Sequence, residues 1–187
     1  MSEKLKKYET ISACGIDCGL CPRFYTKGDS VCPGCGGLNF RKKHPGCAIL
    51  TCCVIKNGFE TCADCEDFPC LRFKNTGCDS FTTHKKMISN IENIKTNGIE
   101  YFIEKQKIRI GILSNFLTDF DDGRSKNFFC QACTLLPIEE LQEVHNEAKK
   151  AIATVDLKQK NKFARSLITE AANSLDIDLK LRKKQTK

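Results

Sequence analysis

The sequence contains no long hydrophobic run, and this argues against a membrane-spanning helix. The longest nearly apolar stretch, Ala48–Ile55, is far shorter than the roughly 20 residues that a helix needs to cross a bilayer. The opening residues MSEKLKKYET are basic and lead into no apolar run, which argues against a secretory signal. We therefore expect a cytoplasmic protein with no membrane partner.

Common catalytic motifs are missing as well. His44, His84 and His145 lie far apart and form no HExxH motif, and the chain has no P-loop, no GxGxxG and no nucleophile elbow. A catalytic zinc normally has three protein ligands, often histidines, with a carboxylate base nearby. The sequence therefore argues against an enzyme without settling the question, and it identifies no catalytic residue.

Cysteine, in contrast, is abundant. The 187 residues contain 14 cysteines, and 12 of these lie within residues 1–80. This first part has few periodic apolar stretches, so bound metal ions would have to replace the missing hydrophobic core. We predict a cysteine-rich metal-binding module over residues 1–80 and a helical body with a basic tail over residues 81–187.

Four C-x2-C units indicate how metal ions are held. They are Cys18–Cys21, Cys32–Cys35, Cys62–Cys65 and Cys130–Cys133. In a tight turn such a unit directs two thiolates at one tetrahedral ion. The first two units are separated by ten residues, and this spacing predicts a shared four-cysteine site.

A second site is expected around Cys62 and Cys65. Its preferred third ligand is Cys52, and its fourth is Cys47 or Cys70. Cys14 either replaces one of these ligands or works with Cys70. His44, in the sequence His-Pro-Gly-Cys, is interpreted as a surface residue beside a turn rather than as an imidazole ligand.

Three chemistries compete for these thiols. A disulfide framework is typical of small secreted chains and is disfavoured here by the turn pairs and the absence of an export signal. The spacing Cys14-x3-Cys18-x2-Cys21 also suits a four-iron cluster. Structural zinc, with two or more ions, fits the spacing best.

Helical periodicity dominates the second part. Helices are expected over residues 82–97, 99–120 with a break near Gly111, about 137–152, and 156–173. Gly98 is expected to end the first of them. Leu175, Ile177, Leu179 and Leu181 alternate with period two, which predicts a strand. The expected fold is therefore a small α+β protein: an irregular, zinc-ribbon or knuckle-like module packed on a mainly α-helical part with a short terminal strand.

Two features of the second part have competing interpretations. Cys130 and Cys133 lie in a segment without glycine, so we expect buried free cysteines that pack as small apolar residues, with a third metal site completed by residues such as Cys53 and Cys78 as the alternative. Residues 122–126 (DGRSK) are interpreted as a loop that enters a helix, with an anion site as the alternative.

The cysteine motifs resemble those of a prokaryotic family catalogued as domain of unknown function 3795. The resemblance lies in CGxDCGxCP from Cys14, CPGC from Cys32 and CxxCxxFPC from Cys62, and it continues in residues 122–130 and 175–182. It implies zinc binding without a known activity. The positions that it carries over as metal ligands are Cys14, Cys18, Cys21, Cys32, Cys35, Cys47, Cys52, Cys62, Cys65 and Cys70.

Three functional hypotheses follow. The leading one is a zinc-binding adaptor whose partner is another protein, because sites of four cysteines leave the metal no open position. The second is an iron–sulfur or thiol-redox protein, which would use the surplus thiols. The third is nucleic-acid binding, in which Phe24, Tyr25 and Phe40 would stack on bases beside Arg23 and residues 41–43. The formal net charge of +7 includes a charged tail that we interpret as a solvated terminus.

Overall fold

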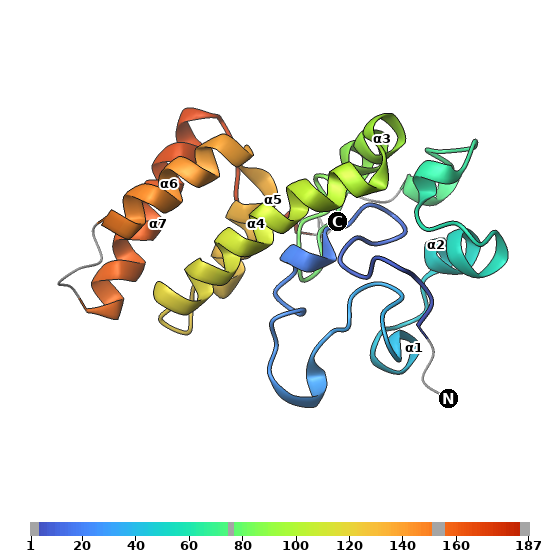
Figure 1. The fold of residues 1–187 in the computed structure, drawn as a ribbon, viewed down its shortest axis with the longest axis horizontal. Coiled ribbons are helices and arrows are strands. Elements are labelled where there is room, and N and C mark those ends of the chain that lie inside the picture. Colours follow the sequence, from blue (N-terminus) through green and yellow to red (C-terminus); the bar gives the residue numbers. More distant parts are fainter. Residues whose placement is uncertain (1–3, 75–76, 151–155, 184–187) are drawn as a thin grey trace. The chain divides into compact units, whose positions relative to one another are not determined.

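The computed structural model describes residues 4–74, 77–150 and 156–183, and these residues form helices joined by turns (Figure 1). The α-helices are α1 Phe40–Lys43, α2 Ala48–Leu50, α3 Met87–Asn97, α4 Ile99–Asp119, α5 Lys126–Leu135, α6 Ile138–Lys150 and α7 Leu157–Ser174. The short turns are the 3-10 helices η1 Cys18–Leu20, η2 Gly28–Ser30, η4 Cys62–Asp64 and η5 Leu71–Phe73, and the π-helical turn η3 Thr51–Lys56. None of the helices in these ranges is both long and apolar enough to cross a membrane.

The expected α+β fold with a terminal strand is wrong, because the protein is mainly helical. In the three described ranges there is no sheet, and the strand-like pairing is an isolated antiparallel bridge between Ile11 and Asp17. A period-two pattern indicates a strand only where a second strand pairs with it. Leu175–Leu181 has no such partner among the described residues.

A hydrogen-bonded helix end occupies the start of the predicted strand. The amide of Ile177 donates to the carbonyl of Ala172 (2.8 Å), and the amide of Asp176 donates to that of Asn173 (3.2 Å). Asp176 is left-handed, with φ of 52°. This is a Schellman motif, which normally places glycine at the left-handed position. Because aspartate stands there instead of glycine, the sequence does not mark the end of the helix.

The chain forms two compact units. Unit 1 comprises residues 1–105 and 181–187, and unit 2 comprises residues 106–180. The division falls inside α4, which continues through Gly111 without the expected break.

In unit 1 the elements are short and the backbone packs closely. Gly15 has φ of +89°, and a Cβ there would collide with the carbonyl oxygen of Met87 at the start of α3. Asn90 of α3 donates to the Gly15 carbonyl (2.9 Å), so the first cysteine segment is attached to α3 by its backbone. The expected stop at Gly98, with φ of +88°, is confirmed.

Unit 2 is held by helix packing around aromatic rings. Phe116, Phe120 and Phe129 have no exposed surface, and the rings of Phe116 and Phe129 stack at 5.1 Å between centroids. The side chain of Asp156 accepts from the Gln159 amide (2.9 Å) and caps α7 where the sequence places the start of that helix.

Candidate metal centre

Two C-x2-C units form the turns that their spacing predicts. In η1 the amide of Cys21 donates to the carbonyl of Cys18 (3.1 Å), and in η4 the amide of Cys65 donates to that of Cys62 (3.2 Å). The Thr61 side chain accepts from the Ala63 amide (3.2 Å) and so caps the second turn. Each turn brings its two cysteines to one side of a tight bend.

Cys14, Cys18, Cys35 and Cys47 form one group, here called the first thiol group. Cys14 and Cys35 are buried, and Cys18 and Cys47 pack against the same core. Cys14 and Cys47 both raise the pKa of Cys35, and Cys35 and Cys14 raise that of Cys18. All four thus share one core, although the chain separates them by up to 33 positions.

Backbone amides face the sulfurs of the first thiol group. The Cys35 amide hydrogen-bonds to Cys18, the Ala13 amide to Cys35, and the Ile16 amide to Cys14. Each of these hydrogen bonds lowers the pKa of the thiol that it meets, because it stabilises the thiolate. Thiolates that ligate metals are stabilised by such surrounding donors.

Cys21 and Cys32 form a pair beside this group. Cys32 raises the pKa of Cys21, while the amides of Arg23 and Phe24 lower it. The sequence joined Cys18, Cys21, Cys32 and Cys35 in one site. Besides burial, Cys35 and Cys21 both raise the pKa of Cys18 and Cys32 raises that of Cys21, so the structure keeps these four residues near one another, and Cys14 and Cys47 add to the surroundings of Cys35.

Cys53, Cys62 and Cys65 form the second thiol group. Cys53 and Cys62 are buried and joined by a hydrogen bond between their thiols. Cys65 is close enough to Cys62 to raise its pKa. Sequence reasoning passed over Cys53, because nothing in the pair Cys52–Cys53 shows which thiol faces inward.

The predicted ligands Cys52 and Cys70 belong to neither thiol group. Cys52 is half-buried, and its sulfur is 3.9 Å from the Asn57 side-chain nitrogen. Cys70 packs against the core of unit 1 as a half-buried residue. His44 is exposed and stacks on Phe40 at 4.6 Å between ring centroids, as expected for a surface histidine.

Lys6 is a buried cation next to both thiol groups. Its side chain has no exposed surface, and its Nζ donates to the Ile11 carbonyl (2.8 Å) and lies 3.8 Å from Glu60 Oε1. Its charge lowers the pKa of Cys35 and of Cys53. No local pattern in the sequence distinguishes the buried Lys6 from its exposed neighbour Lys7.

Burial dominates the electrostatics of the first thiol group. Burial raises the pKa of Cys35 to about 12, and burial followed by the charge of Cys35 raises that of Cys18 well above its usual range. Buried thiolates repel one another at low dielectric. A divalent cation reverses this balance, because its charge stabilises all the thiolates around it.

The donor set suits zinc or iron, both of which thiolates bind well. With the side chains as placed, no group of three or more His, Cys, Asp or Glu residues within the described ranges is arranged to hold a metal ion. The cysteine side chains would therefore have to adopt other rotamers, with their sulfurs directed at one point, to bind a metal ion.

Cysteines outside the two groups differ in their surroundings. Cys130 and Cys133 of α5 have no exposed surface and form no disulfide, as expected for cysteines that pack as small apolar residues. The carbonyl of Cys133 accepts from Arg109 Nη1 (2.7 Å), which satisfies the end of α5. Cys78 is exposed.

The aromatic residues considered for base stacking have other contacts. Phe40 is 5% exposed and belongs to the core of unit 1. The hydroxyl of Tyr25 donates to the Gly19 carbonyl (2.7 Å), and its ring meets Phe24 edge to face. Arg23 lies over the ring of Phe81, with its Cζ 4.8 Å from the centroid.

Residues 10–75 match the family model described as Protein of unknown function (DUF3795), so the resemblance seen in the cysteine motifs is confirmed for this segment. The match contains both thiol groups. No curated protein and no solved structure matches the chain.

Proposed function

We propose that this protein, with its DUF3795 segment, binds structural zinc through cysteine thiolates and acts as a binding or adaptor module. The observation that supports this best is the first thiol group. Its four soft donors belong to or pack against one buried core, and rotation of the side chains would have to bring the sulfurs together around an ion. Tetrahedral zinc with four thiolates is the usual form of a closed structural site.

Cys14, Cys18, Cys35 and Cys47 would hold the first ion, and Cys53, Cys62 and Cys65 are the donors for a second. The role of the metal would be to tie segments that have little apolar core of their own. Binding of structural zinc contributes roughly 10–16 kcal/mol in small metal-dependent modules. A site closed by four thiolates leaves no position for a substrate, so we expect the protein to work through a partner, most simply another protein.

Elemental analysis of protein purified without oxygen tests this function. We expect two or more zinc ions per chain and no visible colour. Cys35→Ser should lower the zinc content by about one ion, because it removes one of four ligands. Cys78→Ser is the matched control, since Cys78 is exposed and belongs to neither thiol group. Iron with acid-labile sulfide, or unchanged zinc in Cys35→Ser, would contradict the proposal.

Thiol redox chemistry is a second candidate, supported by the hydrogen bond between Cys53 and Cys62. Oxidation would join the two sulfurs in a disulfide, release two protons and pass two electrons to a disulfide of another molecule. Mass spectrometry after incubation with oxidised glutathione would detect the loss of two hydrogens in a Cys53–Cys62 peptide. Protein that keeps both thiols free under these conditions would rule out this candidate.

A further inference from the structure

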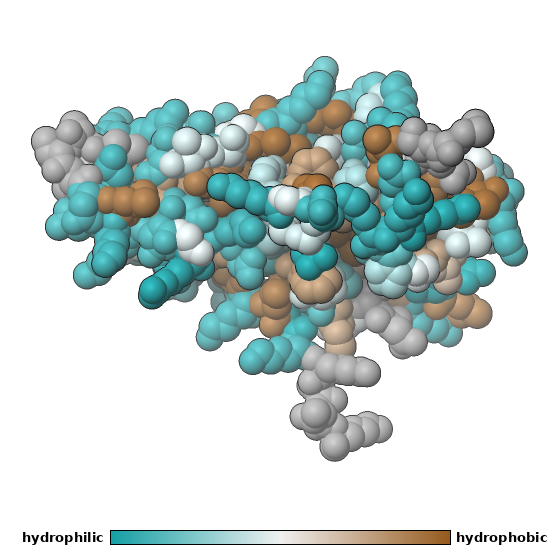
Figure 2. Space-filling model, turned by 90° about the horizontal axis from the view of Figure 1, so that it is seen from below, coloured by the Kyte–Doolittle hydropathy of each residue, from teal (hydrophilic) through white to brown (hydrophobic). Residues whose placement is uncertain are grey.

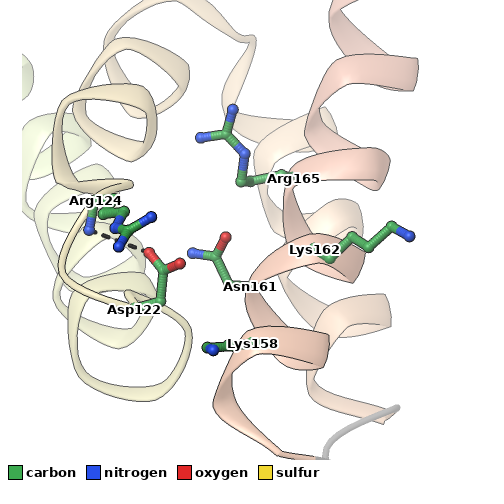
Figure 3. Close-up of a pocket in the computed structure, with 6 residues that line it drawn as sticks. All are labelled: Asp122, Arg124, Lys158, Asn161, Lys162 and Arg165. Carbon is green, nitrogen blue, oxygen red and sulfur yellow. Dashed lines mark hydrogen bonds between the residues drawn. The ribbon is translucent and has the colours of Figure 1, made fainter.

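A hollow of about 480 Å³ in unit 2 lies where the loop after α4 faces α7. Its lining residues are Asp122, Arg124, Lys158, Asn161, Lys162 and Arg165. In Figure 3, Lys158, Asn161 and Arg165 extend from α7 toward the side where Asp122 and Arg124 lie, whereas Lys162 extends the other way. Hollows of this size commonly hold small molecules.

Arg165 is held in place by a buried hydrogen-bond network. Its Nη1 donates to Ser125 Oγ (3.2 Å), Ser125 donates to Asn161 Oδ1 (3.2 Å), and Asn161 Nδ2 donates to the Phe120 carbonyl (2.8 Å). Ser125 and Asn161 are 3% and 6% exposed. The guanidinium also lies 4.2 Å from the ring centroid of Phe128. A fixed arginine loses little conformational freedom when it binds an anion.

The loop opposite α7 is equally well defined. Asp121 Oδ1 accepts from the amides of Gly123 (3.1 Å) and Ser125 (2.9 Å), and Asp122 Oδ1 accepts from the amide of Arg124 (3.1 Å). These bonds set the path of the backbone that carries Arg124 into the lining of the hollow.

The positive charge in the hollow is not neutralised. In the ranges that the structure covers, Arg124, Lys158 and Arg165 have no ion pair with a carboxylate. With Asp122 counted against them, the side chains that face the hollow leave an excess of two positive charges. A phosphate monoester carries about −1.5 to −2 at neutral pH, so it would balance them.

A second hollow of about 580 Å³ shares Arg165 with the first. Its apolar lining comes from Phe128, Ala172, Ile177 and Leu179, and its polar lining also includes Asp176, Asp178 and Lys180. A ligand anchored at Arg165 by its phosphate therefore has apolar surface next to it. The hydrophobic effect favours an aromatic or aliphatic body in that position.

We propose that unit 2 binds a small phosphate monoester with an apolar body. Arg124, Lys158 and Arg165 contact the phosphate, the body lies against Phe128, and Asp122 accepts from a donor group of the ligand. The proposal is independent of zinc binding, because its residues belong to unit 2 and lie outside both thiol groups.

Calorimetric titration of the full chain with phenyl phosphate and with inorganic phosphate, at low salt, tests this site. We expect one binding site per chain and tighter binding of phenyl phosphate. Arg165→Gln should weaken phenyl phosphate binding about tenfold or more, as expected for loss of a charge-assisted hydrogen bond. Arg124→Gln should act similarly, and because the Arg124 side chain is exposed, we expect this variant to fold like the parent protein.

Lys160→Gln is the matched control, because it removes one positive charge from α7 at a residue that lines neither hollow. Less than about twofold weakening is expected for it, since distant charges are screened by salt. Equal weakening in all three variants, no binding at millimolar ligand, or equal affinity for the two probes would overturn the proposal. Binding of a single-stranded oligonucleotide that phenyl phosphate does not displace would overturn it in favour of nucleic acid.

Discussion

Unit 1 and unit 2 bury their residues by different means. Unit 2 packs long helices around stacked rings, with Phe116, Phe120 and Phe129 fully buried. Unit 1 has short turns over residues 4–74, close backbone contacts such as Gly15 against Met87, and thiols as a large part of its core. Aromatic burial stabilises a fold without help, whereas a core of thiols gains most of its stability when a metal binds.

The two units also differ in the kind of ligand that their candidate sites would bind. In unit 1 several thiols belong to one core cluster, which would suit a soft cation. In unit 2 an excess of positive charge gathers at an open hollow, which suits an anion. If the two units fold separately, a change that unfolds one of them should leave the other intact.

Removal of metal should unfold unit 1 and leave unit 2 folded. Zinc would contribute roughly 10–16 kcal/mol per structural ion, more than a small domain normally has to spare. Hydrogen exchange before and after treatment with a chelator should show protection lost around η1 and η4 and retained in α5 and α7. An unchanged exchange pattern over residues 10–75 would show that no metal stabilises them.

Truncation of the aromatic core should destabilise unit 2 and leave metal binding in unit 1 unchanged. Phe116→Ala removes a fully buried ring that contacts Phe120, Phe129 and His145, and it should cost about 3–5 kcal/mol. Urea denaturation measures the loss, and the zinc content of the variant should equal that of the parent protein. Loss of metal in Phe116→Ala would show that the two units do not fold separately.

Close backbone packing in unit 1 can be tested at a glycine. Gly15→Ala should cost more than about 2 kcal/mol, because left-handed φ costs an alanine roughly 1–2 kcal/mol and its Cβ also meets the Met87 carbonyl. Gly28→Ala is the control, since Gly28 has φ of +73° and no atom within 4 Å of an added Cβ. Equal losses in the two variants, measured by urea denaturation, would mean that the contact with α3 contributes nothing.

The last described residues contribute a smaller, pH-dependent term. Asp79 Oδ1 lies 2.8 Å from Arg182 Nη2 and also accepts from the His84 amide (2.8 Å). Burial alone would raise the pKa of Asp79, but the hydrogen bonds from Arg182 and His84 outweigh it and hold the pKa below the ordinary value of 3.8. The contact therefore stabilises the fold fully above pH 3.8, and this contribution is lost as the pH falls through the lower pKa of the folded state.

Asp79→Asn should cost about 1.5 kcal/mol at pH 7, because it removes charge-assisted hydrogen bonds to a partly exposed arginine. The difference from the parent protein should shrink when urea denaturation is repeated near pH 3. A difference that stays constant from pH 7 to pH 3 would show that the Asp79 charge makes no contribution.

Helices with a long apolar period could be predicted well from the sequence. α3 ends at Gly98, α7 is capped by Asp156, and Cys130 and Cys133 are buried as expected. The terminal strand was wrong, because alternating apolar residues need a pairing partner that local sequence does not reveal. Leu175–Leu181 instead follows a Schellman motif at Asp176.

The candidate sites were predicted only in part. The spacing of η1 and η4 marks pairs of thiols that a turn brings together, and both turns are present. Which pairs meet could not be predicted, because Cys14 and Cys47 reach Cys35 through the folding of long loops. The sequence indicated one side of the anion hollow, because residues 122–126 were considered as an anion site. It did not indicate Lys158 and Arg165 of α7, which line the other side.

The sequence by itself therefore determined the local features: the thiol turns, the amphipathic helices, their caps and the family match of residues 10–75. These features depend on residues a few positions apart, whose geometry the backbone sets. Four other features depended on the fold: the grouping of the thiols, the burial of Lys6, the ion pair between Asp79 and Arg182, and the position of Arg165. They join residues tens of positions apart, and such contacts form only when the whole chain has packed.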